Sequence, residues 1–451
     1  MAAVAVVGVL GLAACSSSSS SSASSSASSA STSAPVSGSS SAAGSATSGS
    51  ISWWASPITT SAKYGDTRTA LINAFEKQYP GIHVSLISAP TSTDTNRATL
   101  ATDISGGSAT PDVFMGDVIW PAQFGAHQFA VPLSDYLPAS YWSQFAPGLV
   151  AGATYNGKVY GSPLFEDQGF MYYRKDLLAK AGLSPPTTWQ QLESEAKTLV
   201  SKNLVKYGFV WQGASYEGLT CNFMEYLASA GGTATNSGYT QATLDSPQAI
   251  QALTFMRGLI TSGASPAAVT TFQEAQAMNT FAAGDAAFLR NWDYAYTDAT
   301  NPATSKLTAS QVGVEPMPAF QGQPTPGYSN IGGWNMYINP HSKNIAADLT
   351  FIKFLASPTA QTILATEFSE IPTTTVVRDS PTVIALNPVL AIVGMTKLVP
   401  RPAGTPNYPA LSTAIYTNVN AALAGSSSPS SALAAAQSQA NTALTSPAGG
   451  L

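Results

Sequence analysis

The sequence predicts an α/β protein whose folded body is large enough for two domains. From residue 51 onward, short apolar segments alternate with segments of helical periodicity, in the order strand, helix, strand, helix, strand. That order is typical of a parallel sheet covered by helices. The body from 51 to 451 exceeds the usual length of one domain, and 44% of the chain is hydrophobic. Two sizeable cores are therefore expected.

Periodicity and chain breakers place the first elements. The face of the first helix is formed by Leu71, Ile72 and Phe75, and Pro80-Gly81 ends it. The residues after that break alternate between apolar and polar, as in a strand with one buried face. We expect a strand at 51–54, a helix at 67–79, a strand at 83–87, a helix at 97–104 and a buried strand at 111–115.

The remaining elements follow from the same signals. Gly182 closes one helix and Thr188 caps the next. We expect strands at 158–164, 171–174, 286–291, 312–314 and 336–338, with 286–291 at a sheet edge. Helices are expected at 175–181, 189–200, 275–283, 346–356, 359–366, 381–386, 410–423 and 430–444, and further α/β segments at 207–211, 219–230 and 248–261.

The N-terminal residues predict export and a lipid anchor. The apolar run from Val4 to Leu12 has the length of a signal-peptide core and is too short to span a bilayer. Leu12-Ala13-Ala14-Cys15 resembles the lipobox of bacterial lipoproteins, in which the cysteine is lipidated. Residues 16–50 are almost entirely Ser, Ala, Gly and Thr and cannot bury enough surface to order themselves. We expect a signal peptide at 1–15, lipidation at Cys15, and a disordered tether at 16–50 that holds the body outside the cell membrane.

Composition excludes several classes of partner. The net charge is −5, so nothing favours binding to nucleic acid or to an anionic membrane surface. Charged residues make up 10% of the chain, against an average near 25%. With Cys15 lipidated, Cys221 has no partner for a disulfide within the body and is expected to be a small buried hydrophobe.

A search for catalytic and cofactor motifs finds none. No metalloprotease, nucleophile-elbow, phosphate-loop or dinucleotide pattern is present, and His83, His127 and His341 lack metal-ligand spacing. We therefore expect no catalytic residue, no metal and no cofactor. Glu166 and Asp167 are adjacent, so on a strand they face opposite sides and cannot act as a pair. A glycoside hydrolase that uses Asp167 with another acid, such as Asp117, stays open as an alternative.

Aromatic residues beside single polar residues favour a carbohydrate ligand. Such pairs occur at 117–120, at 292–294 and at 332–334. An aromatic ring covers the apolar face of a sugar, while carboxylate and guanidinium groups bind its hydroxyls. Clusters of this kind at strand ends are typical of a ligand site.

The order of short motifs along the body carries a resemblance to a known family. The body resembles the sugar class of extracellular solute-binding proteins of ABC importers, family 1, and is most similar to its trehalose/maltose-binding type. The matching segments are AFEKQYPG at 74–81, PDVF at 111–114, MYYRKDLL at 171–178 with PTTW at 186–189, FAAGDAAF at 281–288 and FLASP at 354–358. Three further segments are similar to the trehalose/maltose type, namely YEGL at 216–219, RNWDYA at 290–295 and VPRP at 399–402.

The resemblance implies which residues contact the sugar. Trp292 and Tyr294 match its stacking aromatics, Gly333 and Trp334 a backbone donor and a second aromatic wall, and Glu217 lies in the segment that lines its cleft. The hydroxyl-binding charged groups correspond to Asp66, Arg97, Asp117, Asp167 and Arg401. Two departures leave the identity of the disaccharide open. Phe165 stands where the family has a tyrosine, and Asp66 stands where a longer acid is expected.

The resemblance also implies architecture and partners. It implies a two-lobed periplasmic-binding-protein fold of type II, with an N-lobe at 51–165 and 297–335, a C-lobe at 166–296 and 336–451, and a hinge between them. We expect a monomer that closes on a di- or oligosaccharide and is then recognised by the permease subunits of an ABC importer. A longer malto-oligosaccharide and a β-linked disaccharide are alternative ligands, and a surface adhesin that needs no hinge is an alternative class.

Overall fold

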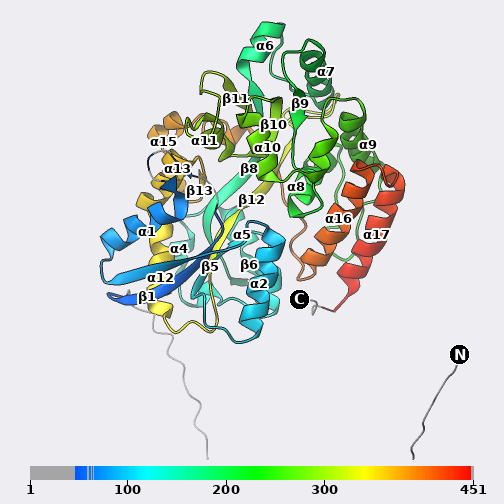
Figure 1. Cartoon of the computed structure of the whole chain (residues 1–451). Helices are drawn as coiled ribbons and strands as arrows, with labels where there is room; N and C mark the ends of the chain where they lie inside the picture. Colours follow the sequence, from blue (N-terminus) through cyan, green and yellow to red (C-terminus); the bar gives the residue numbers. More distant parts are fainter. Residues whose placement is uncertain (1–45, 58–59, 62, 64, 448–451) are drawn as a thin grey trace, which may run out of the picture. The chain divides into compact units, whose positions relative to one another are not determined.

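A computed structural model describes residues 46–57, 60–61, 63 and 65–447 (Figure 1). The predicted signal peptide at 1–15, the lipidation site Cys15 and most of the tether at 16–50 lie outside the described residues. The folded body begins earlier than residue 51. Strand β1 starts at Gly49, and the backbone N–H of Ala46 donates to Thr350 Oγ1 over 3.2 Å.

The main sheet follows the order β4-β1-β5-β12-β8-β10-β9. Strand β1 pairs in parallel with β4 and β5, which confirms the parallel arrangement predicted for the first three strands. The bounds are β1 Gly49–Ala55, β4 Ile82–Ser88, β5 Val113–Asp117, β8 Ser162–Arg174, β9 Tyr207–Val210, β10 Ala286–Trp292 and β12 Tyr328–Ile338. Because β8 and β9 flank β10, the prediction that 286–291 forms an edge strand is wrong, and β9 ends the sheet instead.

Two long antiparallel strands, β8 and β12, run through both parts of the sheet (Figure 1). The first half of β8 pairs with β12, and its second half pairs with β10 and with β11, Val312–Glu315. Strand β12 pairs with β5 near its end and with β14, Lys397–Val399, near its start. The sequence predicted separate strands at 158–164 and 171–174. Residues 162–174 instead form one strand, β8, because the polar residues 166–168 are also buried, whereas Lys158–Val159 form the separate short strand β7.

Helices cover both faces of the first part of the sheet. On one face, Trp53 of β1 packs against Phe351, with ring centroids 5.2 Å apart, and Phe351 packs against Phe75 at 4.9 Å. On the other face Phe114 stacks on Tyr337. The covering helices are α1 Thr67–Gln78, α12 Ile345–Leu355 and α13 Pro358–Phe368 on the first face, and α2 Thr93–Ser105 and α3 Pro121–Ala126 on the second.

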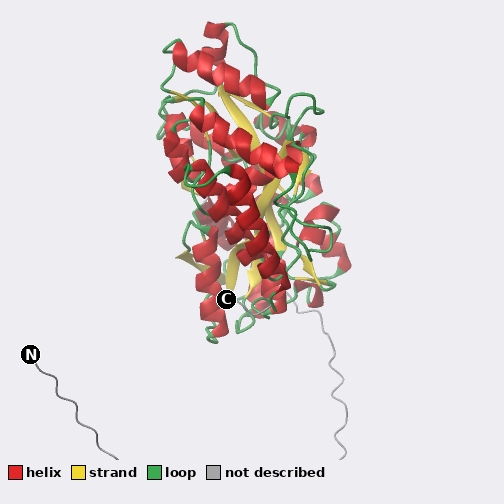
Figure 2. Cartoon of the chain, turned by 90° about the vertical axis from the view of Figure 1, so that its right-hand side faces the viewer, coloured by secondary structure: helices red, strands yellow, loops and turns green. Residues whose placement is uncertain are grey.

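The second part of the sheet has its own helical cover. Trp189 stacks on Tyr226 at 4.1 Å inside this core. Seen from the side that carries the C-terminal helices, strands run between layers of helices (Figure 2). The helices are α6 Lys175–Ala181, α7 Trp189–Ser201, α8 Glu217–Ser229, α9 Pro247–Thr261, α10 Glu274–Ala282, α16 Tyr408–Leu423 and α17 Pro429–Thr445.

Shorter elements connect these layers. They are β2 Thr60–Ser61, β3 Gly65–Asp66, β6 Thr154–Tyr155, β7 Lys158–Val159, β13 Ile371–Pro372, α4 Ala139–Trp142, α5 Pro147–Gly152, α11 Ala295–Thr300, α14 Thr375–Arg378, α15 Pro381–Leu386 and the 3-10 turns η1 Leu133–Asp135, η2 Ala267–Thr271 and η3 Val393–Met395.

The packing differs from the lobe assignment predicted from the sequence. Helices α12 and α13 pack in the first core, although 336–451 was assigned to the C-lobe. Strand β11 pairs with the second half of β8, although 297–335 was assigned to the N-lobe. The chain thus passes between the two parts at other positions than expected, because the periodicity of a helix shows that it covers a sheet but not which part.

Candidate binding cleft

A cavity of about 320 Å³ lies beside β8 and β12, where these strands pass from the first part of the sheet to the second. Its volume is within the range of small-molecule pockets. Eight of the ten sugar-contact residues predicted from the sequence line it, namely Asp117, Asp167, Glu217, Trp292, Tyr294, Gly333, Trp334 and Arg401. They come from β5, β8, β10, β12, the start of α8, and the chain just after β10 and β14.

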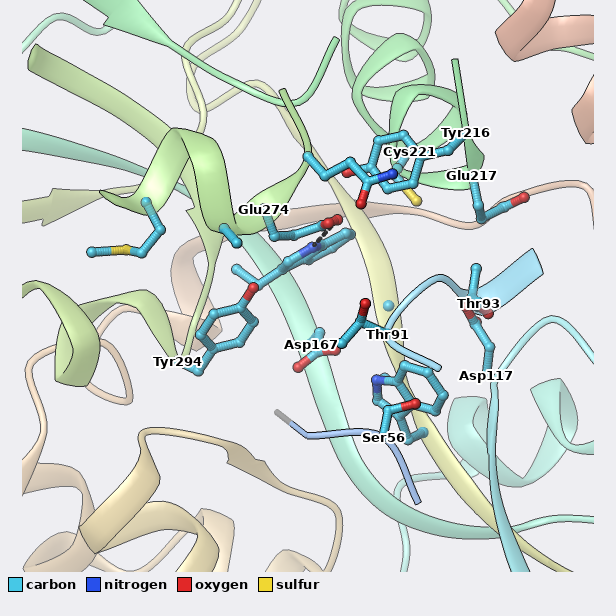
Figure 3. A pocket seen from close by; sticks show the side chains of 18 of the residues that line it. Ser56, Thr91, Thr93, Asp117, Asp167, Tyr216, Glu217, Cys221, Glu274 and Tyr294 are labelled. Atoms are coloured by element: carbon cyan, nitrogen blue, oxygen red, sulfur yellow. Dashed lines mark hydrogen bonds between the residues drawn. The ribbon is translucent and has the colours of Figure 1, made fainter. Parts of the chain in front are cut away.

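Trp292 presents an aromatic face whose orientation is fixed by its neighbours. The Arg290 guanidinium lies 4.1 Å from the centre of the indole ring, a cation–π contact. Arg290 is itself held by Glu225, through Nε–Oε2 at 2.9 Å and Nη2–Oε1 at 2.5 Å. The indole Nε1–H donates to Glu274 Oε1 over 3.5 Å. Tyr294 lies on the far side of the cavity from Asp117 (Figure 3).

Arg401 joins two carboxylates at the opposite wall. Its guanidinium donates to Asp117 Oδ1 over 2.7 Å and Oδ2 over 3.3 Å, and to Glu217 Oε1 over 3.0 Å. Thr93 Oγ1 donates to Asp117 over 3.2 Å, and Ser412 Oγ donates to Glu217 Oε2 over 2.6 Å. These charges are buried and paired, so they form a rigid array of donors and acceptors.

Burial shifts two of the acids toward neutrality. It raises the pKa of Glu217 to about 7, although the charge of Arg401 acts in the opposite direction. Burial also raises the pKa of Asp167 to about 7, although hydrogen bonds with Asp293 and Glu370 lower it. Near neutral pH each carboxyl can therefore act as a hydrogen-bond donor as well as an acceptor.

Comparison with known proteins identifies the chain. Residues 59–362 match the family described as bacterial extracellular solute-binding protein, which is well over half of the chain. The chain belongs to this family.

Individual relatives support the assignment of this solute-binding protein. It is 34% identical over 369 residues to a probable ABC transporter-binding protein of Deinococcus radiodurans, which covers 80% of this chain and 86% of the relative. Its structure is similar to that of maltose-bound MalE3 of T. maritima, with a TM-score of 0.80, 33% identity, and coverage of 87% of this chain and 99% of MalE3. A solute-binding protein of Thermotoga lettingae bound with α-D-tagatose gives a TM-score of 0.78 and 26% identity, with 88% and 100% coverage. These likenesses confirm the two-lobed fold of type II.

Two predicted contact residues of the solute-binding protein do not line the cavity. Asp66 caps α1, where it accepts from the backbone N–H of Arg68 over 2.8 Å and pairs with the Arg68 guanidinium. Arg97 lies on α2 and donates to Gln123 Oε1 over 3.2 Å. An acid directly before a helical segment is a capping signal, and that signal could have assigned Asp66 a structural role.

Several cavity residues of the solute-binding protein were missed. Glu274 holds the Trp292 indole, yet it stands 18 positions earlier in the chain, at the start of α10. Ser56, Thr91 and Thr93 also line the wall; Ser56 and Thr91 lie in loops, and Thr93 is the first residue of α2. Only the fold brings them to the cavity. In the part of the chain that the structure describes, no helix combines the length and apolar character needed to cross a bilayer.

Proposed function

We propose that this protein captures a trehalose/maltose-like di- or oligosaccharide in the cavity and delivers it to an ABC importer. One observation carries the proposal. The Trp292 ring and the paired charges of Asp117 and Arg401 line the same cavity of about 320 Å³. An aromatic plate and bidentate charged groups are what a neutral polyhydroxylated ring requires. The maltose bound by MalE3 and the tagatose bound by the Thermotoga lettingae protein support a carbohydrate ligand.

The transport cycle that we propose uses the crossing strands as its hinge. Asp117 belongs to the first part of the sheet and Trp292 to the second, so a sugar that contacts both residues favours the closed state. Strands β8 and β12 join the two parts. We propose that the monomer works outside the cell membrane, with Cys15 as its lipid anchor and residues 16–50 as a tether, and that importer permeases recognise its closed form.

A second cavity favours the longer malto-oligosaccharide among the alternative ligands. It has a volume of about 250 Å³ and shares Arg401 with the first cavity. Its wall includes Tyr155, Tyr239 and Phe165. Phe165 removes the hydroxyl contact expected there, and the partly exposed rings of Tyr155 and Tyr239 suit the C–H faces of a further sugar unit.

The first test is a ligand screen by thermal shift, followed by calorimetry. A bound sugar raises the unfolding temperature by mass action, so maltose, trehalose, maltotriose and a β-linked disaccharide can be ranked. We expect Trp292→Ala to lose about 1–3 kcal/mol of binding free energy, roughly 5- to 150-fold in Kd. Tyr136→Ala, which removes an exposed aromatic ring outside the cavity, serves as the matched control.

Three outcomes would count against the proposal. Unchanged titration heats for Trp292→Ala would show that the platform is misplaced. Scattering without compaction at saturating sugar would argue against closure. Release of monosaccharide that is lost in Asp167→Asn would favour a glycoside hydrolase.

A further inference from the structure

Three acidic side chains from distant segments meet beneath the cavity. Asp167 lies on β8, Asp293 directly follows β10, and Glu370 directly precedes β13. Asp167 is 6% exposed and the other two are fully buried. Each offers a carboxylate oxygen, and these oxygens lie within 4.8 Å of one another. Such proximity of three buried acids needs a compensating positive charge.

The hydrogen bonds around the group leave part of it uncompensated. Asp293 accepts from two backbone N–H groups, Gln168 to Oδ1 over 3.2 Å and Ile371 to Oδ2 over 3.0 Å. Among the described residues, no N–H, hydroxyl or amide donor reaches Glu370 Oε1, Glu370 Oε2 or Asp167 Oδ1, so the hydrogen bonds open to these oxygens are those with the other carboxyls of the group. A fully buried side chain with two unpartnered oxygens is therefore directed at the other two acids.

In the described part of the chain, none of the ion pairs involves Asp167, Asp293 or Glu370. The charge of Arg401 reaches Asp167, but Arg401 is already paired with Asp117 and Glu217. Burial raises the pKa of Asp167 to about 7 and that of Glu370 well above its usual value, and the charges of Asp167 and Asp293 raise the pKa of Glu370 further. Either protons or a bound cation must supply the missing positive charge.

We propose that Asp167, Asp293 and Glu370 bind a hard divalent cation of the Ca²⁺ class. All donors are carboxylate oxygens, which suit Ca²⁺ and do not suit softer ions that prefer nitrogen or sulfur. With Ca²⁺–oxygen distances of about 2.3–2.6 Å, two ligand oxygens on opposite sides of one ion lie about 5 Å apart. The carboxylate oxygens of the three acids lie within 4.8 Å of one another, so one ion can contact all three. The two backbone N–H groups favour the ionised form of Asp293 that a metal ligand requires, although burial and the charge of Asp167 raise its pKa well above the usual value when no cation is bound.

The cavity supplies the remaining ligands and a route for the ion. Asp167 belongs both to the acidic group and to the cavity wall, so water in the cavity can complete the coordination. The bound ion would tie together β8, β10 and β13 where the sheet crosses between its two parts. This proposal does not rest on sugar binding, because the acids and their spacing are independent of the ligand.

The test compares the full chain with two variants after removal of metal by EDTA. Wild-type protein should gain several degrees in unfolding temperature on addition of Ca²⁺ and show saturable binding heat. Glu370→Gln keeps the shape of the side chain and removes its charge, so Ca²⁺ affinity should fall at least tenfold. Glu367→Gln is the control, since Glu367 is the same residue type three positions earlier and lies outside the group.

Each result decides the proposal. If Ca²⁺ changes neither the unfolding temperature nor the titration heat of the wild-type protein, the proposal is overturned, and protons shared among the acids supply the positive charge. A Ca²⁺ response unchanged in Glu370→Gln also overturns it, because the ion then binds elsewhere. If Glu370→Gln does not fold, calorimetry of wild-type protein in two buffers at pH 6.5 decides. Proton release on Ca²⁺ binding supports the site, and its absence rejects it. Sugar titrations in EDTA separately test the proposed function.

Discussion

At the scale of single residues, Arg401 determines the electrostatic balance of the cleft. It is the shared partner of Asp117 and Glu217, and all three side chains are buried. Removal of the guanidinium leaves two carboxylates that repel each other without compensation. We expect Arg401→Gln to lower the free energy of unfolding by about 3 kcal/mol, measured by urea denaturation at pH 8.

A partly exposed arginine provides the comparison for Arg401. Arg378 lies 3.5 Å from Asp379 and 3.8 Å from Glu166, and its side chain is 27% exposed. Solvent screens the pair with Asp379, and the nitrogen–oxygen distance to the buried Glu166 is long, so Arg378→Gln should change stability less than Arg401→Gln, by about 1 kcal/mol. Equal losses in the two variants would show that burial of the Arg401 pairs has little energetic effect.

The residues that line the cavity could be predicted only where a short motif shows both a suitable side chain and its place at the end of a strand. Trp292 and Tyr294 were found because they flank a single acid at the end of a strand, and both line the cavity. Asp293, the acid between them, could not be recognised, because its partners Asp167 and Glu370 stand far away in the chain. Asp66 caps α1 and does not line the cavity, and its place directly before a predicted helix is the signal for that capping role.

At the scale of elements, the contact between β12 and β8 depends on Gly333. Its φ is +118°, and a Cβ there would lie 2.5 Å from the carbonyl oxygen of Phe165 and 3.0 Å from Glu166 Cα. Gly333→Ala must push β12 away from β8 and displace Trp334. We expect a loss of about 1–3 kcal/mol in unfolding free energy, together with weaker sugar binding.

A second glycine separates this effect from a general cost of alanine. Gly394 lies in η3, and a Cβ at that position would meet open space. Gly394→Ala should leave the unfolding midpoint and the titration curve unchanged. A Gly333→Ala protein as stable as Gly394→Ala would mean that the two strands can separate without cost.

Helices could be predicted more completely than the crossing strands. Helices such as α7 and α13 have a capping residue and one buried face, and their predicted ends lie within two residues of the observed ones. Strands β8 and β12 are buried on both faces for most of their length, so no alternation reveals them. In β8, the polar residues 166–168 interrupt the apolar run that would otherwise mark a central strand.

At the scale of the whole molecule, few side chains are charged, so the pH dependence of stability comes mainly from a few buried acids. Burial raises the pKa of Asp167, Glu217 and Asp348 to about 7. In the unfolded chain these groups titrate near pH 4. The folded state therefore binds more protons than the unfolded state between about pH 4 and 7, and the stability from these groups is lost as pH rises through 7.

This linkage predicts that mild acid stabilises the protein. In EDTA, the free energy of unfolding should increase as the pH falls from 8 to 5, with a slope of up to about 1.4 kcal/mol per pH unit for each group. The acids with lowered pKa, Asp66, Asp112 and Asp176, oppose this only below about pH 4. Asp348 lies on α12 away from the cavity, so Asp348→Asn should remove its share of the slope and leave sugar affinity unchanged. Urea denaturation at four pH values measures the slope, and a stability that falls steadily from pH 8 to 5 would contradict it.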